Sequence, residues 1–373
     1  MTVTRRTFIL ASGSFAVLPQ FASAAPAAKD LQSVMDNAYT FLKSKQKEDG
    51  SFMPPQTGEP GMTALIAAGM IRSGKTASDP VVAKALKYLE NCIKDDGGIY
   101  NKGLANYTTA LGVMALSEAN EKGKYDKALA AANKFLRTLQ YGDGDDVNDK
   151  DAKYGGAGYG KKGERGGGAD LSNTHFFLEA LMASGAAKDD PAVKRAVAFL
   201  GRSQNLPGEF NDQPFAGKVS EDDKGGFIYN MADATNDKSE KKTAAGGLRS
   251  EGGMTYAGLK SFLYAGVSKD DPRVKAAIAW CRNHYTLESN PGQAANGLFY
   301  YYHTFAKAMS ALGENPFTDA KGVKHDWKQE LFDKLKGTQK ADGSWTNDQS
   351  KAFMENAPEL ATAFALLALT YCK

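Results

Sequence analysis

Two sets of residues in this chain have the types and spacing that a catalytic or binding site needs. Asp170, Asn173 and Thr174 lie three and four residues apart, so on a helix they would share one face. His175 and Glu179 lie four apart and could act as a base and the residue that orients it. A structural role stays open for both sets: Asp170 could cap a helix, and the His–Glu pair could be a hydrogen bond on a helix surface.

A second concentration of such residues surrounds His303, which follows a run of tyrosines and could face a cavity as a base or a ligand. A structural role is the alternative for this histidine. Tyrosines at the expected helix starts could line a pocket for a cation or an isoprenoid chain, or could pack between repeats. We therefore treat Asp170 and His303 as candidate catalytic residues, and the candidate ligand-binding residues are Tyr107, Asn173, His175, Tyr256 and Tyr302.

Metal and cofactor chemistry has weaker support in the sequence. Residues 143–151 hold five aspartates and could bind calcium, but they lack the glycine and distal glutamate of an EF-hand loop, so a solvated acidic turn is the alternative. Cys92, Cys281 and Cys372 lie far apart on apolar stretches, which is typical of buried structural thiols. We expect no metal and no cofactor.

The elements that must position these residues are pairs of helices. Asp79-Pro80, Asp190-Pro191 and Asp271-Pro272 are helix starts, because Asp accepts hydrogen bonds from free amides and Pro fits the first turn. The helices that follow carry one apolar stripe. The second helix of a pair, as in residues 110–116 and 361–369, is apolar nearly all round and should be buried.

A sequence pattern at the end of the first helix recurs along the chain. Its first copy is Phe41-Leu42, then Gln46 and Gly50-Ser51-Phe52; its last copy is Leu335, Gln339 and Gly343-Ser344-Trp345. We place the other glutamines of the pattern at Gln140 and Gln204, and the glycines of the third and fourth copies at Gly144 and Gly225. In the second copy Ile93, and in the fifth Tyr285, takes the glutamine position.

A long fixed period of this kind indicates a repeat architecture. Six pairs of alternately half-exposed and buried helices fit two concentric rings, and we favour this closed ring over an open solenoid. The expected fold is therefore all-α, an (α/α)6 toroid with almost no sheet, over residues 25–373.

The N-terminus and the charge constrain location and partners. Residues 4–10, with Arg5 and Arg6, and the small residues 22–24 match a twin-arginine export signal over residues 1–24; an ordinary secretory signal is the alternative. We expect a periplasmic or extracellular protein. The net charge of +3 falls to +1 without the signal, which gives no reason to expect nucleic acid. We expect no transmembrane segment in the remaining chain.

The recurring Phe/Tyr-Leu, Gln and Gly-x-aromatic pattern resembles the repeats of squalene and oxidosqualene cyclases and of protein prenyltransferase β subunits. The resemblance covers essentially the whole mature chain and implies an α/α toroid with a ligand cavity at the mouth of the inner ring. It also implies that Gln46, Gln140, Gln204 and Gln339 tie neighbouring outer helices together, and are structural.

The residues that make those relatives enzymes are incomplete here. Cyclases of this kind protonate an alkene with the middle acid of Asp-x-Asp-Asp, but the matching place reads Asp170-Leu171-Ser172-Asn173, with serine at the donor position. The literal Asp143-Gly144-Asp145-Asp146 stands at the wrong end of a repeat. Prenyltransferases hold zinc with Asp, Cys and His, and only His303 has a counterpart.

Three functional hypotheses follow from these observations. The first is an exported toroid that binds an isoprenoid or another elongated apolar ligand; if it is an enzyme, the resemblance implies a cyclase or prenyltransferase. The second is a carbohydrate-active (α/α)6 enzyme, which needs two carboxylates facing one cavity. The third is a non-catalytic scaffold that binds other proteins.

Overall fold

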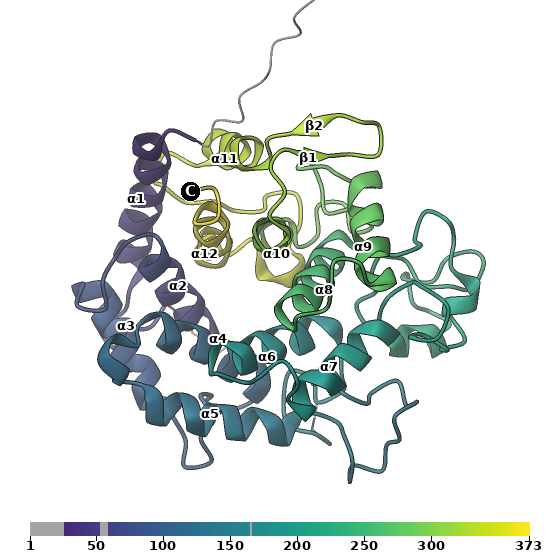
Figure 1. Cartoon of the computed structure of the whole chain (residues 1–373). Helices are drawn as coiled ribbons and strands as arrows, with labels where there is room; N and C mark the ends of the chain where they lie inside the picture. The colour runs from purple at the N-terminus through teal and green to yellow at the C-terminus, as the bar shows by residue number, and fades with distance from the viewer. Residues whose placement is uncertain (1–25, 53–58, 165) are drawn as a thin grey trace, which may run out of the picture.

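The computed structural model describes residues 26–52, 59–164 and 166–373. The export signal predicted for residues 1–24 lies outside these residues. Figure 1 shows the described helices arranged as one ring inside another. The six inner helices are α2 (Gly61–Arg72), α4 (Ala105–Glu118), α6 (Leu171–Ala183), α8 (Gly252–Tyr264), α10 (Leu298–Leu312) and α12 (Pro358–Leu369).

The inner helices form a closed ring. Each packs against the next, and α12 packs against α2 (Figure 1). Almost every residue in the middle of these helices is buried, as in residues 108–116 and 361–369. A helix that contacts neighbours on both sides and an outer helix behind it has no polar face, which explains why its sequence is apolar nearly all round. The closed ring expected from the sequence is confirmed.

The outer ring alternates with the inner one along the chain. Its helices are α1 (Ala28–Lys45), α3 (Pro80–Asn91), α5 (Asp126–Leu139), α7 (Pro191–Arg202), α9 (Pro272–Asn283) and α11 (Trp327–Thr338). Asp79, Asp190 and Asp271 are N-caps whose side chains accept amide hydrogen bonds, and a proline follows each at the first helical position. These three predicted helix starts are confirmed.

Little else is regular in the described part of the chain. One antiparallel pair joins β1 (Phe317–Thr318) to β2 (Lys324–His325). Four 3-10 turns lie in the loops: η1 (Glu121–Gly123), η2 (Ala216–Lys218), η3 (Met231–Thr235) and η4 (Ala352–Met354). The near absence of sheet agrees with the expectation from the sequence.

The four repeated glutamines each join one outer helix to the next one. Gln46 Nε2 donates to the carbonyl of Gly50 at 3.1 Å and to that of Val81 on α3 at 2.8 Å. The other glutamines make the same two kinds of bond: Gln140 to Gly155 and Ala192, Gln204 to Gly225 and Arg273, Gln339 to Gly343 and Val34. The bond from Gln339 to Val34 joins the end of α11 to α1 and so closes the outer ring.

The repeated glycines allow the backbones to approach closely. Gly50 has φ +89°, and a Cβ there would lie 2.3 Å from the Lys84 carbonyl oxygen on α3. In the third copy this glycine is Gly155, where a Cβ would lie 1.9 Å from the Arg195 carbonyl oxygen. Gly144 has no atom within 4 Å of that position, so its assignment to the pattern was wrong: the acidic loop is inserted before the structural glycine.

The fifth copy keeps the connection with a different side chain. The Tyr285 hydroxyl donates to Glu330 on α11 at 2.8 Å and so links consecutive outer helices as the glutamines do elsewhere. Tyr285, which the sequence placed at the glutamine position, therefore takes over the glutamine's role of linking two outer helices.

Candidate functional site

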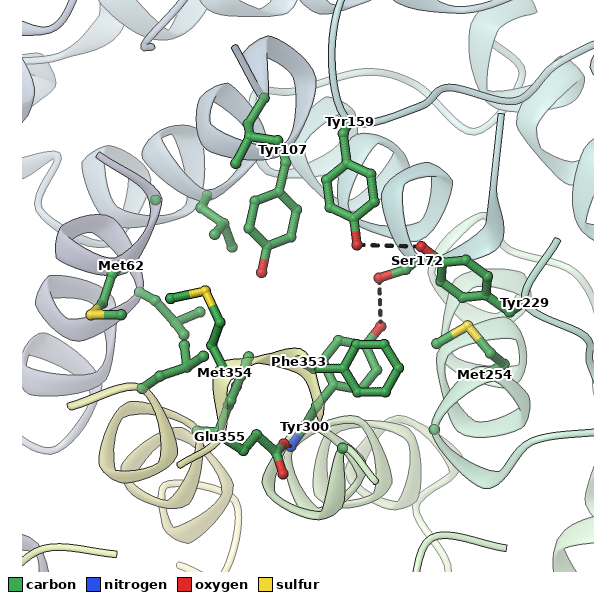
Figure 2. Close-up of a pocket in the computed structure, with 18 of the residues that line it drawn as sticks. Met62, Tyr107, Tyr159, Ser172, Tyr229, Met254, Tyr300, Phe353, Met354 and Glu355 are labelled. Atoms are coloured by element: carbon green, nitrogen blue, oxygen red, sulfur yellow. Dashed lines mark hydrogen bonds between the residues drawn. The ribbon is translucent and has the colours of Figure 1, made fainter. Parts of the chain in front are cut away.

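The N-terminal ends of the inner helices surround a cavity of about 290 Å³ (Figure 2). Its walls come from the first turns of all six helices and from the loops that lead into them. Most of the lining is apolar or aromatic, as is typical of small-molecule sites. The lining includes Met62, Leu65, Leu104, Tyr107, Leu111, Tyr159, Ser172, Tyr229, Met254, Tyr300, Phe353, Met354, Leu360 and Phe364.

Six of the polar side chains in this wall carry hydroxyl groups: Tyr107, Thr108, Tyr159, Ser172, Tyr229 and Tyr300. Figure 2 shows the Tyr229 hydroxyl donating to Tyr159, at 3.3 Å, and Ser172 facing Tyr300, also at 3.3 Å. Burial raises the pKa of Tyr229 and of Tyr300, so both phenols stay neutral. Tyr159 lies in a glycine-rich loop that contains Gly155, Gly156, Gly158 and Gly160. Asn106 fixes the backbone of this loop, because its amide donates to the Tyr159 carbonyl and its side chain donates to the Gly158 carbonyl.

Three of the four large apolar side chains that are exposed in the described chain line this cavity. Leu104 is 38% exposed, Phe353 59% and Met354 42%. Their φ angles are +46°, +56° and +63°, a conformation that costs energy for residues other than glycine. Figure 2 shows Phe353 and Met354 projecting into the space between the other lining side chains. We call the three exposed side chains, Leu104, Phe353 and Met354, the apolar rim of the cavity.

Three glutamates line the cavity, and each already has partners. Glu59 accepts from the amides of residues 101, 102 and 103 at 3.2, 2.9 and 2.7 Å. Glu355 accepts from the Tyr300 amide at 2.8 Å and so caps α10. Glu251 pairs with Lys241 at 2.5 Å. Burial raises the pKa of Glu251 and of Glu355 in spite of these bonds.

The predicted catalytic acid does not line this cavity. Asp170 is the N-cap of α6, and its carboxylate accepts from the Asn173 amide at 2.8 Å and from the Asn173 side chain at 2.7 Å. The capping role left open by the sequence is thus present. Burial raises the pKa of Asp170 to about 7, although the bonds from Asn173 oppose this.

Asp170 should therefore leave a signature in the pH dependence of stability. Its folded pKa lies above the unfolded value, so the folded state binds more protons between about pH 4 and pH 7. The carboxyl group of Asp170 should therefore lower the free energy of unfolding as pH rises through that window. The decrease should be about 1.4 kcal/mol per pH unit at the steepest point. Asp170→Asn keeps a capping oxygen and should lose this slope in urea denaturation at pH 4 to 7. An unchanged slope would contradict the raised pKa.

Of the other residues proposed from the sequence, some line the cavity and others pack between helices. Tyr107 lines the cavity directly, while Asn173 is not among the lining residues and holds Asp170. Tyr256 is buried, with its ring centroid 5.7 Å from Tyr301. The Tyr302 hydroxyl donates to the Leu287 carbonyl at 2.7 Å. These two tyrosines pack between helices, as the alternative for the cluster allowed.

A buried ionic cluster fills the ring axis below the cavity. Lys260 donates to Glu179 Oε2 at 2.8 Å and contacts His175 Nδ1 at 3.0 Å. Lys307 pairs with Glu179 Oε1. Lys260, Lys307 and His175 are no more than 2% exposed. His175 and Glu179, paired in the prediction, thus meet through Lys260.

The charges of this cluster follow from its geometry. Burial by itself raises the pKa of Glu179, but the two lysines outweigh it and hold that pKa well below its usual range. Burial lowers the pKa of Lys260 to about 8, and that of Lys307 also falls, with Glu179 opposing both changes. Burial is the main cause that lowers the pKa of His175, and the charge of Lys260 lowers it further, so His175 is neutral.

His303 lies near the buried ionic cluster and does not line the cavity of about 290 Å³, which we call the upper cavity. It is 1% exposed on α10, its Nδ1 atom has no hydrogen-bond partner, and its ring centroid lies 5.8 Å from Phe364. Burial, then Lys307, lowers its pKa well below the usual value, so it is neutral. A smaller cavity of about 190 Å³, the lower cavity, opens at the other end of the axis. Arg72, Glu179 and Lys307 are among its lining residues.

The sequence comparison and the first of the fold comparisons both lead to terpene cyclases. The squalene-hopene cyclase C-terminal domain family matches residues 55–221. The type II terpene cyclase MstE from Scytonema superposes with a TM-score of 0.54 and 13% identity, over 92% of this chain and 98% of that chain. A variant of that enzyme in complex with geranylgeranyl dihydroxybenzoate gives 0.56 and 13%, over 92% and 97%. The chain therefore has the fold of a terpene cyclase-like α/α toroid.

Toroids of another class share this architecture. A possible member of the GH105 family from Salmonella enterica superposes with a TM-score of 0.52 and 12% identity, over 98% of both chains. No curated protein sequence is significantly similar to the chain. At these identities the solved structures show the fold alone, so the chemistry of this terpene cyclase-like toroid has to be argued from its own residues.

The toroid places a hydroxyl where the resemblance implies the cyclase acid. Ser172 lines the cavity, so this position does face the ligand space. A serine hydroxyl is far too weak an acid to protonate an alkene.

Among the described residues no group of three or more His, Cys, Asp or Glu could hold a metal ion. In the acidic loop Asp145 pairs with Lys162 at 2.6 Å.

Sequence reasoning missed the residues that dominate the ring axis. Lys260 and Lys307 stand in apolar inner helices, where a lysine has no solvent to reach, and that conflict is the signal that could have identified them. Phe353 and Met354 carry no comparable signal, because their exposure depends on the positive φ angles of a loop.

Proposed function

We propose that this toroid binds an isoprenoid or another elongated apolar ligand in the upper cavity. The observation that carries the proposal is the apolar and aromatic lining together with the rim of Leu104, Phe353 and Met354. Exposing three large apolar side chains around one opening is unfavourable in water unless a ligand covers them. The cyclase relative with a bound geranylgeranyl compound supports a ligand of this class.

The binding residues we propose differ in part from the sequence candidates. Tyr107 is retained, and Tyr159, Ser172, Tyr229 and Tyr300 join it because they line the cavity. Asp170, Asn173, His175 and His303 stay candidates that would act on a ligand through the side chains of the wall.

The carbohydrate-active alternative has one observation in its favour, the glutamates in the cavity wall. A glycosidase needs one carboxyl group as acid and another as base or nucleophile. Here Glu59 and Glu355 accept backbone amides and Glu251 holds a lysine, so each carboxylate already has a structural partner. The apolar rim also offers a sugar few hydrogen bonds. We therefore favour the isoprenoid.

Ligand binding gives a direct test. Geranylgeraniol should raise the melting temperature of the purified protein by several degrees, as binding to the folded state alone requires. Met62→Trp would fill the cavity and should abolish this shift. Val323→Trp, at an exposed site away from the cavity, is the matched control and should keep it. Lipid extraction and native mass spectrometry of protein from its own host should show a co-purifying isoprenoid.

The proposal fails if the purified protein carries no lipid and its melting temperature responds to no isoprenoid. A response to oligosaccharides in its place would support the carbohydrate alternative. If neither class of ligand raises the melting temperature and a partner protein binds at the apolar rim, the result would support the interaction scaffold.

We also propose that the chain is exported by the twin-arginine route, on the strength of the N-terminal signal. No described helix has the length and apolar character needed to cross a membrane. Replacing Arg5 and Arg6 by lysine should leave the protein in the cytoplasm of its host, as fractionation would show. Normal export of that variant would indicate an ordinary secretory signal.

A further inference from the structure

One continuous hydrogen-bonded chain runs down the ring axis from the cavity wall. Tyr300 Oη lies 3.3 Å from Ser172 Oγ and 2.6 Å from His175 Nε2. His175 Nδ1 lies 3.0 Å from Lys260 Nζ, which donates to Glu179 at 2.8 Å. Its upper members, Ser172 and Tyr300, line the cavity, whereas its lower part is the buried ionic cluster.

The lower end fixes the direction of every bond above it. A lysine held in an ion pair with Glu179 is an ammonium, which has donors and no acceptor. His175 Nδ1 must therefore accept from Lys260, and the neutral imidazole carries its proton on Nε2. Nε2–H then donates to the Tyr300 oxygen, so that the phenolic hydrogen cannot point back to the histidine.

We infer that the axis makes Tyr300 a dedicated hydrogen-bond donor to the cavity, so that the ligand carries an acceptor oxygen, such as a carbonyl, beside Tyr300 and Ser172. In the empty cavity the hydrogen faces Ser172 Oγ at the long distance of 3.3 Å, a weak contact that a ligand oxygen can replace. This inference rests on the proposed apolar ligand and narrows it to an oxygenated one. Tyr300 is then the residue that selects the ligand's polar end.

Two probes of matched shape test the preference. The isoprenoid ketone farnesylacetone has an acceptor oxygen, and the isoprenoid hydrocarbon of the same chain length has none. The ketone should bind roughly tenfold more tightly, as one well-made hydrogen bond allows. Tyr300→Phe should erase that difference. Tyr301→Phe, whose hydroxyl donates to the Thr286 carbonyl outside the cavity, is the matched control and should preserve it.

Lys260→Met tests the relay itself and leaves the Glu179–Lys307 pair intact, so the buried cluster keeps one matched ion pair and no unpaired charge. Without the ammonium, a phenol donating to an imidazole nitrogen is the stronger arrangement, and the Tyr300 hydrogen should turn toward His175. The ketone preference should then fall to about the Tyr300→Phe level, although no residue in contact with the ligand has changed. A purely structural lysine would affect both probes equally.

The results separate this inference from the proposed function. If ketone and hydrocarbon bind equally well, the inference is overturned and the apolar site stands. If neither probe binds, both fail. Nitrogen-15 NMR gives a readout without ligand, because the chain has four histidines to assign. A proton on His175 Nε2, with Nδ1 as acceptor, is expected, and the opposite tautomer overturns the inference.

Discussion

Replacing Glu179 with glutamine is expected to lower the free energy of unfolding by about 3–5 kcal/mol, the usual cost of breaking a buried ion pair. Glu179 is the carboxylate that both Lys260 and Lys307 contact at the centre of the ring. Without its charge, two ammonium groups with almost no solvent exposure would face each other unpaired. Urea denaturation at pH 7 should measure the loss.

The deficit of the Glu179→Gln variant should shrink as pH rises from 7 to 9. Lys260 has a folded pKa of about 8, below the unfolded value, so its contribution to stability grows as pH rises through 8 toward 10.5. Removing Glu179 depresses that pKa further, and deprotonation then relieves the unpaired charge at a lower pH. A deficit that is constant with pH would argue against uncompensated lysine charge as its cause.

A matched control uses another carboxylate that neighbours the lower cavity. Glu118 pairs with Arg72 at 3.1 Å, but its side chain is 37% exposed. Glu118→Gln should cost less than about 1 kcal/mol, as is usual for exposed pairs. Equal losses in the two variants would show that burial of the cluster is not what makes Glu179 important.

The second large effect is expected at Gly343, where the last repeat meets the first. Gly343→Ala should lower the free energy of unfolding by about 3 kcal/mol or more, combining backbone strain and overpacking. The residue has φ +89°, and a Cβ would lie 2.3 Å from the Asn37 carbonyl oxygen on α1. The new methyl group would push apart the two outer helices that close the ring.

Gly313 separates the two contributions. It also has a left-handed φ, +71°, but no atom lies within 4 Å of an added Cβ. Gly313→Ala should cost only about 1–2 kcal/mol, the backbone term alone. If both variants lose the same stability in thermal or urea denaturation, close packing at the closure is not what the repeat glycine provides.

Local patterns were sufficient to predict the architecture, because four of the repeats make the same two glutamine bonds, one of them to the next repeat. Gln46 and Gln339 stand at opposite ends of the chain and make the same two bonds, so one copy of the pattern explains the other. The third copy shows the limit of this reasoning. Gly144 followed Gln140 at a plausible distance, yet an inserted acidic loop moves the structural role to Gly155.

The candidate site could be predicted less well, for a physical reason. Asp170 and Tyr107 were found because they start inner helices, and position along a helix is visible in sequence. Which way each side chain points around the ring is not, so Tyr256 and Tyr302 proved to be packed between helices while Tyr159 and Tyr229 line the cavity.

The sequence by itself determined the helix pairs, their caps and the ties that close them into a toroid, since these depend on contacts between neighbouring repeats. Only the tertiary structure decided what lies on the axis. Glu179, Lys260 and Lys307 are on three different helices, and they form one buried ionic cluster only when the closed ring excludes water from all three. That burial gives the cluster its energetic weight and fixes the direction of the hydrogen bonds that lead to Tyr300.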